Sequence, residues 1–193
     1  MSTVFDIAGP LPTGVTVLEA SAGTGKTFAI TALVTRYIVE SGHTADQVLM
    51  VTFAKGAAAE MRERLRARLR DAISALEGSA PPTDAWLTPI YIDEPAARAE
   101  RLARAKDAVA NLDRATITTI HGFCHQALRR LGTHAGDAAL ADEVNAGNPI
   151  LVSRFVRDEL LAELARNLFA FGDLGRLFVV IFFARQLLVQ SHY

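Results

Sequence analysis

Short unbroken apolar runs alternate with longer stretches of helical spacing along the first part of the chain. Val15–Leu18 and Val48–Val51 are short runs of apolar and β-branched residues, and Thr116–Ile120 is β-branched throughout. Such residues favour extended backbone, and a run without polar alternation is typical of a strand covered by helices on both faces. We therefore predict that these segments are strands of one buried sheet.

The predicted helices lie between and after these strands, with apolar residues three and four positions apart along one face. The predicted helical segments are Phe28–Val39, Gly56–Leu76, Ala96–Leu112, Phe123–Leu131 and Ser153–Phe169. Gly78–Pro89, rich in glycine and proline, is predicted to be a loop, as is Gly132–Asn148. The order strand, helix, strand, helix, helix, strand, helix predicts an α/β fold with a parallel sheet and an inserted helical element.

A glycine-rich turn separates the first predicted strand from the first predicted helix. It reads Ala20-Ser21-Ala22-Gly23-Thr24-Gly25-Lys26-Thr27, a P-loop pattern in which Ala20 replaces the usual first glycine. Gly23 and Gly25 allow a tight turn whose amides point at phosphate oxygens, and the helix beginning near Lys26 adds the positive end of its dipole. We expect these eight residues to bind ATP, with Lys26 on the β- and γ-phosphates and the Thr27 hydroxyl on Mg²⁺. The alternative is a strand-to-helix turn that binds nothing.

Two further segments follow the second and third predicted strands. One is Val51-Thr52-Phe53-Ala54-Lys55, and the other is Thr118-Thr119-Ile120-His121-Gly122-Phe123-Cys124. Both lie at the carboxyl ends of strands, the edge at which open α/β sheets bind their ligands. They are therefore candidates for a second binding surface.

These three segments, in this order, resemble motifs I, Ia and Ic of the UvrD/Rep group of superfamily 1 helicases. The likeness covers roughly Val4 to Leu131 and continues more weakly to about Asn167. It implies a RecA-like P-loop NTPase domain in which ATP hydrolysis drives 3′-to-5′ movement along single-stranded DNA. The motif sequences are most similar to those of family members that form one subunit of a helicase–exonuclease. Those members act with two other subunits on double-strand ends in recombinational repair.

Under this resemblance, residues after the second and third strands contact DNA: Thr52, Phe53, Lys55, Thr119, His121 and Phe123. Hydroxyls and a lysine suit phosphate contacts, and an aromatic ring offers a base a stacking face. Alternatives stay open, because Phe53 and Phe123 could be core residues and His121 a buried, hydrogen-bonded histidine. Lys55 stands where many relatives have threonine or another small polar residue.

The charge and the cysteine content bear on the kind of partner and on the cellular compartment that we expect for this chain. Lys and Arg total 20 against 21 Asp and Glu, so the chain as a whole is not a basic nucleic-acid binder. The arginines at 62, 64, 66, 68 and 70 are predicted to form a solvated helix face paired with Glu60 and Glu63. Cys124, the single cysteine, is expected to be a buried thiol in a reducing cytoplasm, and Met1–Gly14 lacks the features of a signal peptide.

P-loop hydrolysis also needs an aspartate on Mg²⁺ and a neighbouring carboxylate. Asp93 and Glu94 are rejected for that role, because Pro95 follows at once and the three residues together are typical of a helix start. We therefore expect an incomplete RecA-like ATP-binding domain over residues 1–131, the start of a helical insertion over 132–171, and an aberrant apolar tail over 172–193. Within this tail, the apolar run Leu177–Val189 is interrupted by Arg185 and Gln186 and is too short to span a membrane. Alternatives are a stand-alone small-molecule phosphotransferase and a non-catalytic truncated fragment.

Overall fold

The structure is a computed structural model of the 193-residue chain. It describes residues 4–13, 16, 18, 25–78, 80–123, 126 and 178–179. By its contacts the chain divides into two compact units, one of Met1–Leu49 and Ala59–Ile117, the other of Met50–Ala58 and Thr118–Tyr193. The predicted domain boundaries at residues 131 and 171, the predicted loop at 132–148 and the predicted helix at 153–169 lie outside the described residues.

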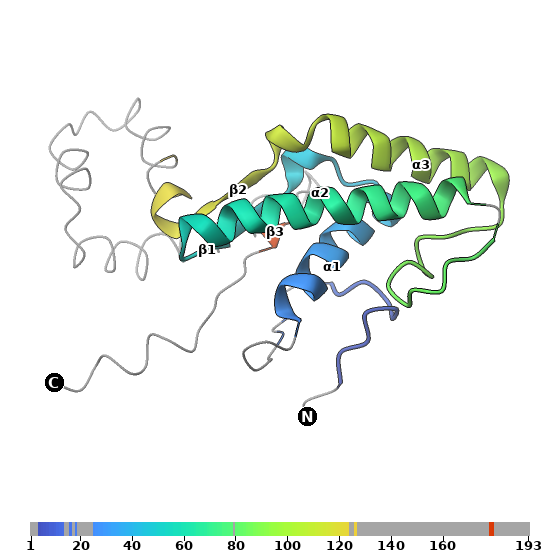
Figure 1. Ribbon diagram of the computed structural model, residues 1–193, viewed down its shortest axis with the longest axis horizontal. Helices are drawn as coiled ribbons and strands as arrows, with labels where there is room; N and C mark the ends of the chain where they lie inside the picture. The colour runs from blue at the N-terminus through green and yellow to red at the C-terminus, as the bar shows by residue number, and fades with distance from the viewer. Residues whose placement is uncertain are drawn as a thin grey trace, which may run out of the picture. The chain divides into compact units, whose positions relative to one another are not determined.

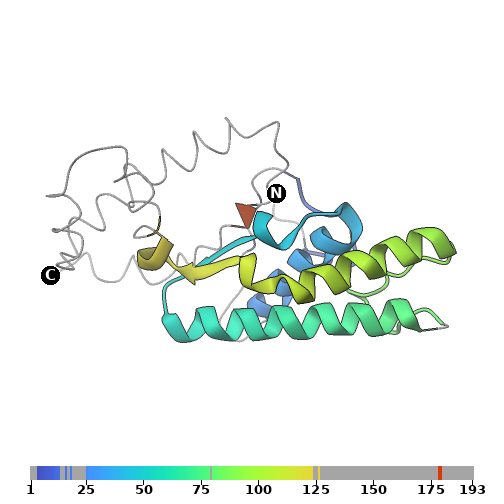
Figure 2. The same ribbon diagram turned by 90° about the horizontal axis from the view of Figure 1, so that it is seen from above.

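The described helices confirm the predicted helical segments between residues 26 and 112. They are α1 (Lys26–Ser41), α2 (Lys55–Glu77) and α3 (Pro95–Ala110), with short 3-10 turns η1 (Ala45–Gln47) and η2 (Leu112–Arg114). Helices α2 and α3 run side by side in both views (Figures 1 and 2), and Lys106 Nζ lies 2.8 Å from Glu77 Oε1 across them. The loop predicted between these two helices is confirmed, since no helix or strand occurs at residues 80–92.

The described strands form one sheet in the order β2-β1-β3. Their bounds are β1 (Leu49–Thr52), β2 (Thr116–Thr119) and β3 (Phe178–Val179). The amide of Thr116 donates to the carbonyl of Val48 over 3.0 Å, so β1 and β2 begin together and run parallel, as predicted. The prediction of an α/β fold with a parallel sheet is therefore confirmed for these two strands, although the described part of the chain is mostly helical.

The strand predicted at Val15–Leu18 is not seen at its described positions. Thr16 and Leu18 lie in no strand, and the other two residues lie outside the described part of the chain. Strand β1 already has β2 on one edge and β3 on the other, so it offers no further backbone partners to a strand at 15–18. A second, smaller difference is that helical residues begin at Ile120, before the predicted start at Phe123.

The core of the first unit is built around α1 and the apolar stripe of α2. Nearly every residue of α1 from Ile30 to Val39 is buried. The predicted apolar stripe of α2 is buried at Met61, Leu65, Leu69, Ala72 and Leu76, and its remaining member, Ile73, is half-buried. Helix α3 contacts α1 and buries the small residues Ala105 and Ala108. Because an alanine side chain adds little bulk, two helix backbones can approach closely at such positions.

Polar contacts tie the N-terminal segment to α1. The Arg36 guanidinium is buried and donates from Nη1 to the carbonyls of Ile7 and Gly9, each over 2.8 Å. The Tyr37 hydroxyl donates to the carbonyl of Pro12. Burial raises the pKa of Tyr37, and the charge of Arg36 opposes that rise. These contacts fix the path of the segment that precedes the glycine-rich turn.

Local capping explains where two of the helices stop or start. Gly42, with φ 76°, ends α1 and donates its amide to the carbonyl of Ile38 over 3.1 Å. Glu94 caps α3 by accepting from the amides of Ala96 and Ala97 at 3.0 and 2.5 Å. The amide of Ala97 and then that of Ala96 lower the pKa of Glu94. The rejection of Glu94 as a hydrolytic acid therefore agrees with its place in the structure, at the start of a helix.

None of the helices in the described part of the chain combines the length and the apolar character that a membrane crossing requires.

Candidate functional site

Gly25, the last glycine of the glycine-rich turn into α1 and the first residue of that turn that the structure describes, has the backbone geometry that a phosphate loop requires. Gly25 is the N-cap, with φ 83° and ψ 19°, and its carbonyl accepts from the amide of Ala29 over 2.9 Å. Glycine reaches this left-handed conformation at no steric cost, whereas other residues are strained there. The helix then begins at Lys26, as predicted. Ala20, Ser21, Ala22, Gly23 and Thr24 lie outside the described residues, so their part in the site stays a prediction.

The electrostatics of this helix start favour an anion. The first turn of α1 contains no acidic residue. The amides at a helix N-terminus have no intrahelical acceptors, and the macrodipole places partial positive charge there. Lys26 and Thr27 are half-buried on that first turn. A polyphosphate therefore fits this end of α1 in charge and in hydrogen-bonding capacity.

A metal at this site depends on oxygen ligands, which Mg²⁺ prefers in proteins. The Thr27 hydroxyl is such a ligand and follows Lys26 directly. No cluster of three or more His, Cys, Asp or Glu residues suited to a metal occurs in the part of the chain that the structure describes. Magnesium binding through Thr27 and nucleotide phosphates is thus chemically suitable, and it stays a prediction.

The second candidate surface lies within the other compact unit, at the carboxyl ends of β1 and β2. Thr52 ends β1 and is 2% exposed, whereas the next residue, Phe53, is 44% exposed. Lys55 is exposed at the first position of α2. The alternative that Phe53 is a core residue is therefore wrong, because nearly half of its surface meets solvent.

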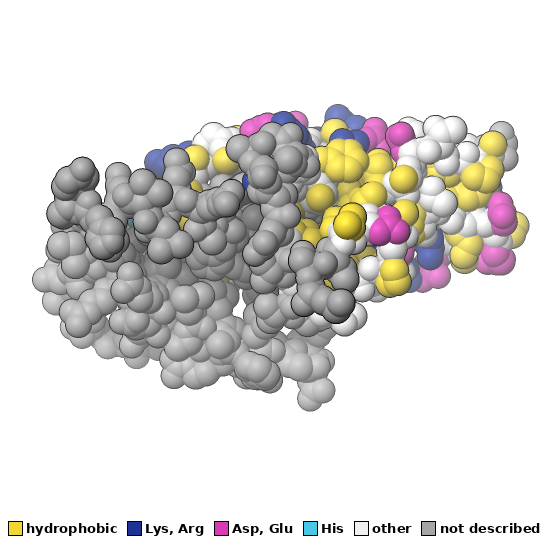
Figure 3. Space-filling view, turned by 90° about the horizontal axis from the view of Figure 1, so that it is seen from below, with side chains coloured by type: hydrophobic (Ala, Val, Ile, Leu, Met, Phe, Trp, Pro, Cys, Tyr) yellow, Lys and Arg dark blue, Asp and Glu magenta, His cyan; other side chains and the backbone are white. Residues whose placement is uncertain are grey.

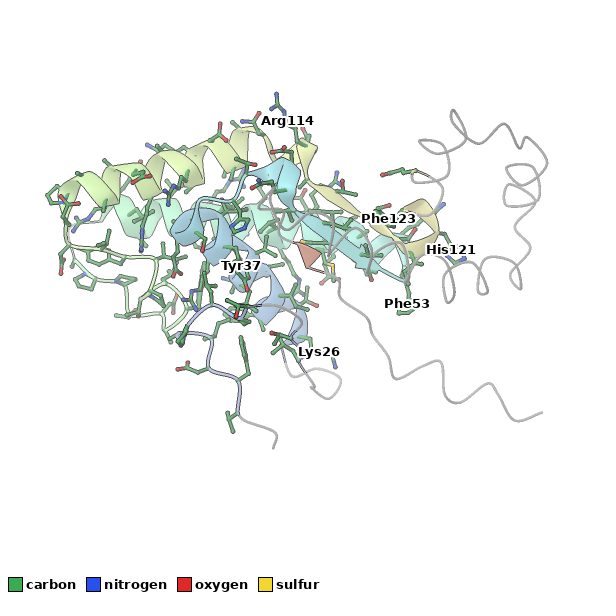
Figure 4. The ribbon with its side chains drawn as sticks, turned by 180° about the vertical axis from the view of Figure 1, so that it is seen from behind. Lys26, Tyr37, Phe53, Arg114, His121 and Phe123 are labelled. Carbon is green, nitrogen blue, oxygen red and sulfur yellow. The ribbon has the colours of Figure 1, made fainter. Side chains whose placement is uncertain are left out.

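A tight helical turn follows the end of β2. Thr119 is buried, and its hydroxyl accepts from the amide of Gly122 over 3.0 Å. A Cβ on Gly122 would lie 2.4 Å from Thr118 Oγ1, so only glycine fits without displacing that side chain. His121 is exposed, which excludes the buried-histidine alternative, and Phe123 is half-buried. Figure 4 shows His121 and Phe123 at this turn, at the same end of the strands as Phe53.

The six residues predicted to contact DNA thus differ in their exposure to solvent. Phe53, Lys55 and His121 are available to a ligand, Phe123 partly so, and the two threonines are buried. Because β1 and β2 are parallel neighbours, the exposed residues emerge at one edge of the sheet. An aromatic ring, an imidazole and an ammonium together can stack on bases and pair with phosphates.

The arginine-rich face of α2 agrees in part with its prediction. Arg64 and Arg66 pair with Glu60 and Glu63, as predicted, with N–O distances of 2.5 and 2.7 Å. In the view of Figure 3, the described surface has a hydrophobic area with Lys/Arg and Asp/Glu side chains scattered around it. Arg62 and Arg68 are exceptions: Arg62 donates from Nη2 to the carbonyl of Ile117 over 3.1 Å, and Arg68 stacks on aromatic rings. Sequence spacing gave no indication of either contact.

A glycine-rich turn into a helix, together with a parallel sheet, defines a P-loop protein of the α/β class. The chain matches the family described as "UvrD/REP helicase N-terminal domain" over residues 6–173. Since that match spans most of its 193 residues, the chain belongs to the UvrD/REP helicase family. This confirms the resemblance carried by the three motifs.

The chain is also similar to curated RecB proteins. It is 45% identical over 165 residues to the RecBCD enzyme subunit RecB of Mycobacterium tuberculosis (strain ATCC 25618 / H37Rv), which covers 84% of this chain and 15% of that protein. It is 36% identical over 146 residues to the RecBCD enzyme subunit RecB of Escherichia coli (strain K12), covering 66% of this chain and 12% of that protein. The chain therefore spans less than a fifth of the length of these relatives.

Proposed function

We propose that this chain is the ATP-binding N-terminal part of a RecB-type, ATP-dependent 3′-to-5′ DNA helicase and exonuclease acting in double-strand-break repair and recombination. Family membership and the similarity to RecB support the proposal. The single observation that carries it is the start of α1 at Lys26, directly after Gly25 in the left-handed conformation. In the whole protein, the proposed partners are single-stranded DNA and RecC- and RecD-like subunits.

The proposed nucleotide site comprises residues 20–27. The backbone amides of the turn and of the α1 N-terminus bind phosphate oxygens, and the Lys26 ammonium neutralises charge on the β- and γ-phosphates. The Thr27 hydroxyl would hold Mg²⁺, which supplies further charge neutralisation on the phosphates when bound. Lys26 and Thr27 are the proposed catalytic residues of the intact enzyme.

The proposed DNA surface comprises Thr52, Phe53, Lys55, Thr119, His121 and Phe123. Phe53 and Phe123 would stack on bases, and Lys55 and His121 would contact the backbone. The buried threonines act mainly by fixing where the exposed residues emerge. This surface tracks a single strand without reading its sequence, because stacking accepts any base.

For the chain alone, we propose nucleotide binding with little hydrolysis and negligible unwinding. Hydrolysis requires a carboxylate that activates water beside the metal-bound phosphates. Glu94 serves as a helix cap instead, with its oxygens engaged by two amides. The proposal therefore predicts ATP binding without strong DNA-stimulated turnover.

The test is calorimetric titration of the full chain with ATP and Mg²⁺, supported by thermal melts with and without oligo-dT. We expect Lys26→Ala to abolish detectable binding, and Lys106→Ala to leave it unchanged, because Lys106 is an exposed lysine of α3 paired with Glu77. Saturation at 100 times Kd stabilises a protein by about 2.7 kcal/mol, enough to raise the melting temperature measurably.

Unchanged nucleotide affinity in a folded Lys26→Ala variant would overturn the assignment of the site. Turnover that responds to small phosphate acceptors and not to DNA would instead support a phosphotransferase.

A further inference from the structure

The first turn of α1 carries an aromatic side chain that is held by two distant parts of the chain. Phe28 follows Thr27 directly. The Arg68 guanidinium carbon, from α2, lies 4.4 Å from the centre of the Phe28 ring. Trp86, from the loop between α2 and α3, meets the same ring edge-on, with ring centres 6.4 Å apart and an interplanar angle of 83°. We call Phe28, Arg68 and Trp86 the aromatic clamp.

The members of the clamp also contact each other, and each partner of Phe28 is itself held in place. Arg68 lies 5.2 Å from the centre of the Trp86 ring and donates to Asp71 Oδ2 over 2.9 Å. Trp86 is only 3% exposed. Phe28 is half-buried. Cation–π and edge-to-face contacts of this kind have preferred geometries, so they fix the position of its ring.

The loop that carries Trp86 is fixed to α3 by a second arginine. Arg101 donates from Nη1 to the carbonyls of Pro89 and Ile90, each over 2.7 Å. Ile90 is fully buried, and its amide donates to the carbonyl of Leu87. Trp86 is therefore held in position where its ring contacts Phe28, in the first turn of α1.

We propose that Arg68 and Trp86 are positioning residues for nucleotide binding, acting through Phe28. A clamp on Phe28 restricts rotation of the first turn of α1, so the turn is preorganised before the phosphates arrive and less ordering is needed on binding. This inference rests on the proposed function, since it requires that nucleotide binds at Lys26 and Thr27. It adds residues that lie outside the phosphate loop and that need not touch the ligand.

The clamp contains its own spectroscopic reporter. Trp86 is the single tryptophan of the chain. Because its ring contacts Phe28, which adjoins Thr27, we expect nucleotide binding to change the intensity or wavelength of Trp86 emission. All intrinsic tryptophan fluorescence comes from this position, so the signal needs no deconvolution.

The test compares two arginines of α2 that differ chiefly in ring contact. Arg68 and Arg66 each form an i,i+3 ion pair, and their side chains are 27% and 26% exposed. Arg66 has no ring contact within the described residues. We therefore expect Arg68→Gln to raise the Kd for ATP about two- to fivefold, the range that a cation–π contact of this exposure supports. Arg66→Gln should leave the Kd and the emission change as in the wild type.

Two substitutions of Phe28 test whether its aromatic ring is what nucleotide binding requires. Phe28→Leu removes the ring and should weaken binding and alter the emission response, whereas Phe28→Tyr retains the ring and should preserve both. ATP binding is measured in parallel by calorimetry, which does not depend on Trp86.

If wild-type chain binds no ATP in the calorimeter, the proposed function fails and this inference fails with it. If ATP binds in a Lys26-dependent manner, but Trp86 emission does not respond and Arg68→Gln binds like Arg66→Gln, the clamp alone is refuted. A lowered melting temperature with unchanged Kd and unchanged emission response would show a purely structural role and would also refute it.

Discussion

Two i,i+4 ion pairs of this chain differ strongly in burial, so together they test what burial does to a charge. Arg36 and Glu40 of α1 lie four residues apart with an N–O distance of 2.5 Å, and Glu60 and Arg64 of α2 have the same spacing and the same distance. The side chains of the first pair are 3% and 15% exposed, and those of the second pair 50% and 56%. We predict very different costs when the arginine is replaced by methionine.

The expected magnitudes follow from solvation. Loss of the exposed pair in Arg64→Met should lower the free energy of unfolding by about 0.3–0.5 kcal/mol, because water screens both charges. Arg36→Met leaves Glu40 as a poorly solvated charge, and the carbonyls of Ile7 and Gly9 lose their donor. Removing one partner of a buried pair costs about 3–5 kcal/mol, because it leaves an uncompensated charge, and the lost hydrogen bonds to the two carbonyls add to that cost.

Urea denaturation of each variant measures the difference, with the transition slope checked for constancy. The double variant Arg36→Met, Glu40→Met should recover part of the loss, because no unpaired charge then remains buried. Salt should weaken the exposed pair and change the buried pair little. Equal costs for Arg36→Met and Arg64→Met, or a double variant no better than Arg36→Met, would refute the reasoning.

Two further predictions concern glycines and a helix cap. Gly122→Ala should lower the melting temperature, because the new Cβ would lie 2.4 Å from Thr118 Oγ1, whereas Gly56→Ala in α2 meets nothing within 4 Å and should stabilise by about 0.5–1 kcal/mol. A reversed order in thermal melts would contradict this. The lowered pKa of Glu94 means that its cap stabilises the fold above the ordinary glutamate pKa, and that this stability is lost as the pH falls through the lowered value. Glu94→Gln should therefore melt below the wild type at pH 7 and approach it in acid, and a gap that persisted at low pH would count against the cap.

The parts of the fold that follow local rules could be predicted from the sequence. The start of α1 at Lys26 needs only a glycine that tolerates positive φ, and the start of α3 needs only an acid before a proline. The buried stripe of α2 follows from the spacing of its apolar residues. In each case the determining residues lie within a few positions of one another.

Contacts between distant residues could not be predicted in this way. Arg68 appeared equivalent to its neighbouring arginines, yet Phe28 and Trp86 surround its guanidinium. Arg36 pairs with Glu40 but also reaches carbonyls 27 and 29 residues earlier in the chain. The final position of a long side chain depends on which elements tertiary packing brings beside it, and helical periodicity contains no such information.

The exposed residues at the edge of the sheet depend on buried ones. All four residues of β1 are buried, so the chain reaches solvent only after Thr52 ends the strand, at Phe53. Thr119 is buried at the end of β2, and by accepting the amide of Gly122 it sets the direction of the turn that carries His121. In the proposed DNA surface, the threonines of both motifs therefore contribute geometry, while Phe53 and His121 contribute exposed side chains. If the proposed DNA surface is correct, Thr119→Ala should weaken DNA binding by displacing the turn that carries His121, whereas Phe53→Ala should weaken it by removing an aromatic face.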